Sequence, residues 1–197
     1  MIYRIVHAIV AFTFRVCFRL KVIGAEHLPQ QGGFLVASNH VSYLDPVIVG
    51  VVAKHKVGYM ARESLFRNFF FGWLIRSLGA FPLKRNTADF RAIREAIRRL
   101  KNGWPVLIFP EGTRKSENKP KEANAGVGFL AVRGGVPVVP MYIVGTDKAL
   151  PVNRKWVRFT PITVHIGPAR VYTADQPHEQ IADDIMGSIQ ALAGPVR

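Results

Sequence analysis

The chain has 197 residues, of which 27 are Lys or Arg and 13 are Asp or Glu, so its net charge is +14. This length predicts one domain with a sizeable core, and the single cysteine, Cys17, excludes an internal disulfide and any cysteine-rich zinc site. So basic a chain is expected to meet an anionic partner, and its hydrophobic content of 49% favours a membrane surface over nucleic acid.

Residues 1–20 are expected to form a helix that carries no acidic residue. Arg4, Arg15 and Arg19 fall on one stripe of this helix. Bulky apolar side chains cover the opposite side, namely Ile2, Ile5, Val6, Ile9, Phe12 and Val16. This pattern is typical of a helix that lies in the membrane interface. The alternative is an ordinary amphipathic helix that packs on the domain.

Neither a membrane-spanning helix nor a signal peptide is expected in this segment. A spanning helix needs about 20 apolar residues, and Arg4 and Arg15 interrupt the run. A signal peptide is followed by a small-residue cleavage site, which this stretch lacks. The chain is therefore expected to divide into an interfacial helix at residues 1–20 and one further domain at residues 21–197.

Strand-like and helix-like segments alternate through the remainder of the chain. Strands are expected at residues 19–23, 34–38, 57–61, 80–84, 105–109, 138–144 and 163–166. Helices are expected at residues 46–53, 65–78, 87–101, 123–133 and 177–192. Such alternation predicts a single α/β domain with a mixed or largely parallel sheet flanked by helices.

Three segments have compositions of note. In the helix at 87–101 the expected core stripe is Phe90, Ile93, Ile97 and Leu100, with Arg91, Arg94, Arg98 and Arg99 mostly off it. The segment 65–78 (LFRNFFFGWLIRSL) is apolar and aromatic, as a membrane contact requires. The stretch 153–159 (NRKWVRF) suits either contact with lipid headgroups or a solvated β-hairpin.

The first motif is the stretch 39–46 (NHVSYLDP), directly after an apolar run. His40 has the chemistry of a general base, and Asp45 can hold its tautomer. Their spacing suits a turn in which Asp45 begins a helix and Pro46 takes the first helical position. The alternative is that Asp45 is an N-cap and His40 an ordinary loop histidine. The stretch alone does not decide between the two.

The second motif is the stretch 109–114 (FPEGTR), after another buried run. Gly112 lets the backbone approach a ligand, and Arg114 can grip a phosphate through two hydrogen bonds. Glu111 can accept a hydrogen bond from a substrate hydroxyl or brace an arginine. The alternative is a tight turn with a surface salt bridge. It does not explain why a carboxylate and a guanidinium follow a buried strand in so basic a chain. Together the motifs predict a proton-abstracting site for an anionic substrate.

Two other site chemistries are not expected. Ser42 would suggest a Ser-His-Asp hydrolase, yet the chain has no Gly-x-Ser-x-Gly elbow and Ser42 lies only two residues from its base. One His and one Asp supply too few ligands for a metal ion. Neither a metal site nor a cofactor is therefore expected.

With these motifs the chain resembles the glycerophospholipid acyltransferases, of which bacterial 1-acylglycerol-3-phosphate acyltransferase is typical, over about residues 20–145. His40 and Asp45 match the first signature of that family, a His followed by four residues and an Asp. The stretch 79–85 (GAFPLKR) resembles its second block, and 109–114 its third. The stretch 136–140 (VPVVP) resembles the fourth block, on the acyl-donor side.

The resemblance also implies a set of residues for the phosphate and glycerol of the acceptor. They are Arg62, Arg85, Glu111, Gly112, Thr113 and Arg114. Arg62 lies in the stretch 60–66 (MARESLF), at a position where relatives commonly have a lysine. The chain departs from the family at Asn124, where relatives often carry a lysine before the glycine that follows at 126.

The activity implied is transfer of a fatty acyl group from acyl-CoA or acyl carrier protein to the sn-2 hydroxyl of 1-acylglycerol 3-phosphate (lysophosphatidic acid). The product is phosphatidic acid, in phospholipid biosynthesis. The expected partners are these substrates and an anionic membrane surface, without nucleic acid, and the expected location is peripheral or monotopic on the cytoplasmic face of the cell membrane. The alternatives are another lyso-acceptor, or a non-catalytic basic module that binds lipid or nucleic acid.

Overall fold

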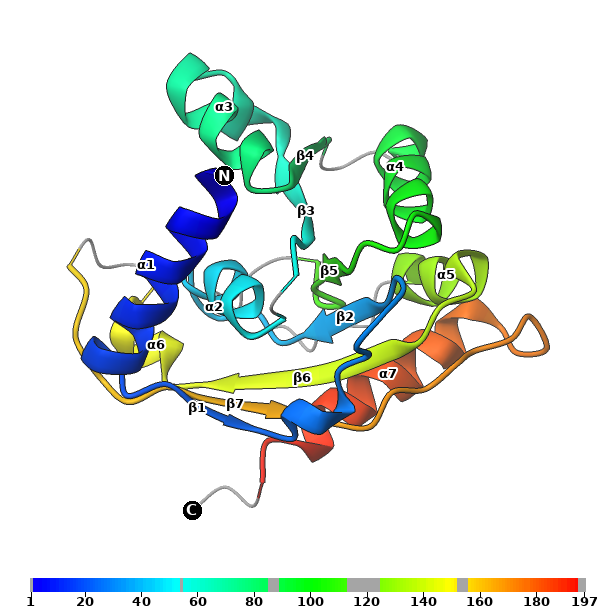
Figure 1. Cartoon of the computed structure of the whole chain (residues 1–197). Coiled ribbons are helices and arrows are strands. Elements are labelled where there is room, and N and C mark those ends of the chain that lie inside the picture. Colours follow the sequence, from blue (N-terminus) through cyan, green and yellow to red (C-terminus); the bar gives the residue numbers. More distant parts are fainter. Residues whose placement is uncertain (1, 54, 85–88, 113–124, 152–155, 195–197) are drawn as a thin grey trace.

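A computed structural model describes residues 2–53, 55–84, 89–112, 125–151 and 156–194 (Figure 1). Seven strands form one sheet in the order β1-β7-β6-β2-β5-β3-β4. Their bounds are β1 (Lys21–Ile23), β2 (Leu35–Ser38), β3 (Gly58–Arg62), β4 (Ala80–Leu83), β5 (Val106–Ile108), β6 (Val138–Val144) and β7 (Thr163–Ile166). The strands β6, β2, β5, β3 and β4 run parallel, whereas β7 pairs antiparallel with β6 and β1 pairs parallel with β7. The expected single α/β domain with a largely parallel sheet is confirmed.

Helices cover both faces of the sheet. They are α1 (Ile2–Cys17), α2 (Asp45–Val52), α3 (Phe69–Ser77), α4 (Phe90–Lys101), α5 (Ala125–Gly134), α6 (Thr146–Ala149) and α7 (His178–Ala191), with the 3-10 helices η1 (Ala25–His27) and η2 (Glu63–Phe66). The central strand β2 shows why two layers are needed. Val36 packs into the core beneath α1 and α2, while Leu35 and Ala37 pack into the core beneath α4, α5 and α7. Successive side chains of a strand point to opposite faces, so a strand buried on both faces is apolar throughout.

The helix α1 has three faces rather than the two expected from the sequence. It rests on the domain through Val10 and Phe14. A stripe on its outer side, defined here as the α1 stripe, is 53–69% exposed and comprises Ile5, Ile9, Phe12 and Val16. Arg4 and Arg15 are exposed beside it. The helix α1 therefore packs on the domain, as the alternative expected, and it also leaves an apolar stripe exposed; its contact with a membrane stays a prediction. Within the described ranges, no helix is both long and apolar enough to cross a membrane.

The expected core stripe of α4 is wrong at its first position. Phe90 is 70% exposed, and the buried residues of α4 are Ala92, Ala96 and Leu100. The small alanine side chains let the helix backbone lie close to its neighbours. Arg99 is partly buried, because its guanidinium donates to the Gly79 carbonyl oxygen at 2.5 Å and its side chain is only 17% exposed.

The apolar segment 65–78 is two elements rather than one helix. The 3-10 helix η2 ends at Phe66, and α3 begins at Phe69. Asn68 separates them, and its side-chain oxygen accepts a hydrogen bond from the Phe71 amide at 2.9 Å. Such a side chain satisfies one of the otherwise unpaired amides at a helix start and favours a new helix there.

Candidate active site

The expected site residues that the structure describes gather at one edge of the sheet. His40 follows β2, Glu111 follows β5, and Arg62 is the last residue of β3. The strand β5 pairs in parallel with β2 on one side and with β3 on the other. Because parallel strands end at the same edge, their carboxyl ends bring these three residues together, as ligand sites of open α/β sheets require. Figure 1 shows β5 lying between β2 and β3.

His40 and Asp45 are in direct contact. The Nδ1 atom of His40 lies 2.9 Å from Oδ2 of Asp45. The Asp45 side chain is fully buried and the His40 side chain is 12% exposed. A carboxylate on Nδ1 holds the tautomer in which Nδ1 carries the hydrogen, so Nε2 is the nitrogen that can accept a proton.

The same carboxylate oxygen also organises the turn. Oδ2 of Asp45 accepts hydrogen bonds from the Val41 amide at 2.7 Å and from the Ser42 amide at 2.8 Å. Asp45 is therefore not a helix N-cap, because the N-cap of α2 is Leu44 and makes no side-chain cap bond. One buried oxygen thus holds both the imidazole and the two backbone amides of the turn in place.

Phe109 supplies a contact to the histidine that sequence reasoning missed. Its ring stacks on the His40 imidazole with 3.9 Å between centroids and 11° between planes. Phe109 directly follows β5, and β5 pairs with the strand that precedes His40. The stacked ring covers one face of the imidazole and limits its rotation, so the orientation set by Asp45 is held from two directions.

Asn39 anchors the histidine turn to the neighbouring strand β6. Its amide nitrogen donates to the Ile143 carbonyl oxygen at 3.0 Å, and its amide oxygen accepts from the Ile143 amide at 2.8 Å. Asn39 is 6% exposed. One side chain thus satisfies both backbone groups of Ile143. Asn39 therefore holds the histidine turn against β6, a role that its position in the motif did not reveal.

Ser42 belongs to the scaffold and not to the chemistry. Its hydroxyl donates to the Leu150 carbonyl oxygen at 2.8 Å and accepts from the Leu44 amide at 3.2 Å. The residue is fully buried. A hydroxyl used in this way is unavailable as a nucleophile, in agreement with the sequence-based argument against a hydrolase.

We expect Asn39→Asp to lower the free energy of unfolding by about 1–3 kcal/mol, because a carboxylate oxygen would then face the Ile143 carbonyl oxygen in a buried site. Urea denaturation of the purified protein measures this change. Asn68→Asp is the matched control, since aspartate also serves as a helix N-cap and the residue is exposed. Equal stability of the two variants would contradict the anchoring role of Asn39.

The second motif forms a tight turn at the end of β5. Gly112 has a φ of 68°, and its amide donates to the Phe109 carbonyl oxygen at 2.9 Å. A positive φ favours glycine. Glu111 is half-buried in this turn, and Arg62 is exposed at the end of β3. Four residues named from the sequence, Arg85, Thr113, Arg114 and Asn124, lie outside the described residues.

A charged and hydrogen-bonding site of this kind can abstract a proton from a hydroxyl. The His40 imidazole can accept such a proton, and the Asp45 carboxylate can stabilise the resulting imidazolium. Among the residues that the structure describes, no group of three or more His, Cys, Asp or Glu side chains could hold a metal ion.

Comparison with known proteins gives consistent results. Residues 19–144, more than half of the chain, match the family model described as Acyltransferase. The chain is 36% identical over 122 residues to the 1-acyl-sn-glycerol-3-phosphate acyltransferase of Bacillus subtilis, covering 61% of this chain and 60% of that protein. It is 33% identical over 123 residues to the protein of the same name from Streptococcus pneumoniae, covering 61% of this chain and 45% of that protein.

A solved structure is similar over nearly the whole chain. It is the crystal structure of the 1-acyl-sn-glycerophosphate acyltransferase PlsC from Thermotoga maritima, with a TM-score of 0.75 and 29% identity. The alignment covers 99% of this chain and 83% of that one.

Proposed function

This chain belongs to the Acyltransferase family, and from that membership we propose that it acylates the sn-2 hydroxyl of 1-acylglycerol 3-phosphate and forms phosphatidic acid. The observation that carries the proposal is the buried contact between His40 and Asp45 at the edge of the sheet. The names of the relatives from Bacillus subtilis and Streptococcus pneumoniae support the choice of acceptor. The acyl donor is a thioester, either acyl-CoA or acyl carrier protein, and no further cofactor takes part.

In the proposed reaction His40 acts as the general base. Its Nε2 takes the proton of the sn-2 hydroxyl, and the hydroxyl oxygen attacks the thioester carbonyl carbon. The tetrahedral intermediate then collapses, the carbon–sulfur bond breaks, and the leaving thiolate takes the proton from Nε2. Asp45 stabilises the transient imidazolium through Nδ1. The acyl group passes directly from donor to acceptor, because Ser42 is committed to the scaffold.

Cationic side chains are proposed to bind the acceptor phosphate. Arg62, Arg85 and Arg114 take this role by resemblance to the family, and a guanidinium suits a phosphate because it donates two parallel hydrogen bonds. Glu111 positions the glycerol. The turn at Gly112 lets the backbone come close to the same substrate, with Thr113 beside it.

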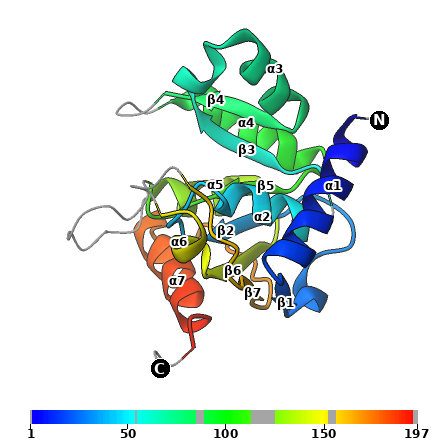
Figure 2. The ribbon, with the colours of Figure 1, turned by 90° about the vertical axis from the view of Figure 1, so that its left-hand side faces the viewer.

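An anionic membrane surface, on the cytoplasmic face of the cell membrane, is the proposed place of action. The acceptor is a single-chain lipid, and the α1 stripe provides an apolar face with arginines beside it. Phe69 and Phe70 of α3 are each 79% exposed, and Trp156 is 84% exposed. Figures 1 and 2 both place the N-terminal end of α1 close to α3. The protein would therefore lie on the bilayer without crossing it.

We expect the double variant Ile9→Ser/Phe12→Ser to bind vesicles with a partition coefficient at least about tenfold lower, since burial of such a side chain contributes about 1.5–3 kcal/mol. Flotation with vesicles that contain phosphatidylglycerol measures the loss. Val171→Ser is the control, because Val171 is 66% exposed but lies outside the α1 stripe. Unchanged flotation of the double variant would rule out the α1 stripe as the membrane contact.

The proposed activity is tested by thiol release from acyl-CoA and from acyl carrier protein with a panel of lysophospholipid acceptors in mixed micelles. We expect release that depends on acceptor and is fastest with 1-acylglycerol 3-phosphate. Preference for a lyso-acceptor without a terminal phosphate would overturn the choice of substrate. No release with any acceptor and either donor would overturn the enzymatic function.

A further inference from the structure

The helix α4 presents an exposed face that is almost entirely basic. Arg91, Arg94, Arg98 and Lys101 follow one another at intervals of three or four residues and are exposed. Residues at these intervals share one side of a helix. The opposite side of α4 is buried through Ala92, Ala96 and Leu100. These four cations are named here the α4 basic face.

The charges of the α4 basic face are only partly neutralised. Glu95 is the one acidic residue of α4. It receives two hydrogen bonds from Arg98 and one from Arg99. Arg91, Arg94 and Lys101 form no ion pair with any side chain in the described ranges. An excess of positive charge on one folded face attracts a partner of opposite charge.

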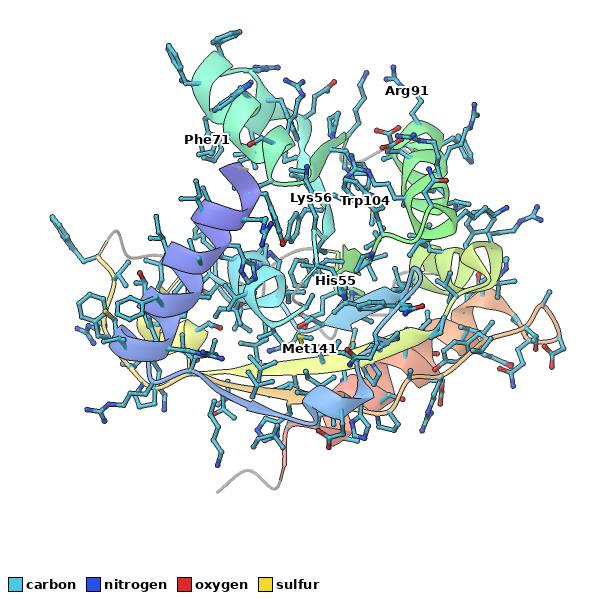
Figure 3. All side chains as sticks on the ribbon, viewed as in Figure 1. His55, Lys56, Phe71, Arg91, Trp104 and Met141 are labelled. Carbon is cyan, nitrogen blue, oxygen red and sulfur yellow. The ribbon has the colours of Figure 1, made fainter. Side chains whose placement is uncertain are left out.

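The helices that carry the α4 basic face and the α1 stripe lie on opposite sides of the molecule. In Figure 1, α1 and α4 lie on opposite sides of β3 and β5, and Figure 2, viewed from the α1 side, shows α4 behind β3 and β4. Figure 3 shows Arg91 projecting upward from the end of α4 at which the helix begins. A protein that places the α1 stripe in a bilayer therefore leaves the α4 basic face in contact with water.

The α4 basic face also begins at the edge of the sheet that carries the candidate site. Asp89 joins the end of β4 to the start of α4, because one of its oxygens accepts from the Lys84 amide at 2.9 Å and the other from the Arg91 and Ala92 amides. From this point α4 runs about 18 Å away from the edge, at 1.5 Å per residue. A partner lying along α4 would thus reach the carboxyl ends of the strands.

The other end of α4 offers a contact for a protein partner. A pocket there is lined by Arg98, Arg99, Asn102 and Trp104. Arginine and tryptophan are enriched among the residues that contribute most to protein–protein binding. The exposed Phe90 ring lies at the start of the same helix. A basic helix with aromatic residues near both ends suits a docked acidic protein better than a lipid surface, which would need a continuous apolar stripe.

We propose that the α4 basic face docks the acidic surface of a carrier protein that bears the acyl group as a thioester. The inference rests on the proposed function, since the carrier is one of the two forms of donor. A carrier bound along α4 holds its flexible thioester arm at the edge of the sheet where His40 lies. Contacts made far from the thioester then distinguish this donor from acyl-CoA, which lacks a protein surface.

The test is the double charge reversal Arg94→Glu/Lys101→Glu. Binding of fluorescently labelled holo acyl carrier protein is measured by anisotropy, and kcat/KM is measured with acyl carrier protein and with acyl-CoA of the same chain length. We expect the Kd for the carrier to rise about tenfold or more and kcat/KM with the carrier donor to fall equally. With acyl-CoA we expect less than about a twofold change. The control is Lys21→Glu, which reverses one charge on the strand at the opposite edge of the sheet. It is expected to alter neither the Kd for the carrier nor kcat/KM with either donor.

Any other outcome contradicts the proposal that the carrier docks on the α4 basic face. Unchanged carrier binding in the double variant, or no binding by the wild-type protein, overturns it. Loss of flotation with anionic vesicles while carrier binding persists assigns the face to the membrane instead. An equal fall of kcat/KM with both donors means that the variant damages the site and not the docking. Failure of the proposed function is recognised separately, as absent transfer from both acyl-CoA and acyl carrier protein in the wild-type protein. The anisotropy measurement then still tests whether the α4 basic face binds the carrier.

Discussion

Replacing His40 with alanine is expected to lower kcat for acyl transfer by about 1,000-fold, with little change in the KM for the acceptor. General base catalysis contributes about 100- to 10,000-fold, and the imidazole is the only base that the described part of the site places beside a buried carboxylate. The measurement is the initial rate of thiol release at saturating lysophosphatidate.

The matched control for this variant is His55→Ala. His55 is exposed and precedes β3, so it lies at the edge of the sheet opposite to the site. Within the described ranges, the hydrogen bond that His55 makes is through its backbone carbonyl, which accepts from the Tyr3 hydroxyl at 2.7 Å, and the alanine variant retains that group. Full activity of the His40 variant would show that another group takes the proton. Loss of activity in both variants would point to a general effect on folding.

Asp45→Asn is expected to lower kcat by about 100- to 10,000-fold and to leave the acceptor KM nearly unchanged. The amide oxygen can still accept from the Val41 and Ser42 amides, but a neutral group does not stabilise the imidazolium that forms on His40. The stability of the variant is also expected to fall by about 1–3 kcal/mol. The reason is that Oδ1 of Asp45 is buried without a hydrogen-bond partner among the described residues, and an NH2 group in its place would be left without an acceptor.

A double-mutant cycle separates the two effects. If Asp45 acts through His40, the double variant His40→Ala/Asp45→Asn is no slower than His40→Ala alone, because the carboxylate has no imidazolium left to stabilise. Independent roles would instead multiply the two losses. Urea denaturation of the single and double variants measures the loss of stability apart from the loss of rate.

The sequence predicted the fold well because most of its strands are uniformly apolar. The strands at 138–144 and 163–166 have the expected bounds, and the others begin or end within two residues of them. Such runs identify strands that are buried on both faces, and their alternation with helices leads to a parallel sheet. The short helix α6 was missed, since four residues carry no period that a pattern could reveal.

The arginine-rich helix α4 shows where hydrophobic patterns fail. Phe90 fits the apolar period, but it is the first residue of the helix and is exposed, and Ala92 and Ala96 take the buried positions instead. Arg99 was expected to lie mostly off the apolar stripe of this helix. Its long stem, however, lies against the domain, with the guanidinium 4.5 Å from the centre of the Phe81 ring. Long charged side chains often bury their stems in this way.

The contact between His40 and Asp45 was predictable because both residues lie in one turn. The stacking of Phe109 on His40 was not, because it depends on the register between β2 and β5. The anchoring role of Asn39 depends on Ile143, which is 104 residues away in the chain. Contacts of this kind come from the assembled sheet and leave no local pattern in the sequence.

The organisation of the site also bears on a non-catalytic reading of so basic a chain. A module that only binds lipid or nucleic acid does not need a buried carboxylate behind a histidine, since burial of an ionised group costs free energy unless several hydrogen bonds compensate for it. Here three donors converge on one oxygen of Asp45. These three hydrogen bonds therefore indicate a site in which the His40 imidazole is held in one tautomer.

Identification of the lipid product tests the proposed acyl transfer most directly. The purified chain is incubated with 1-acylglycerol 3-phosphate and an isotopically labelled acyl thioester, and the phospholipids are analysed by mass spectrometry after regiospecific hydrolysis. We expect phosphatidic acid with the labelled acyl group at sn-2, and its loss in the His40→Ala variant. Absence of labelled phosphatidic acid with both acyl-CoA and acyl carrier protein, from a folded protein that still binds anionic vesicles, would contradict the proposed acyl transfer.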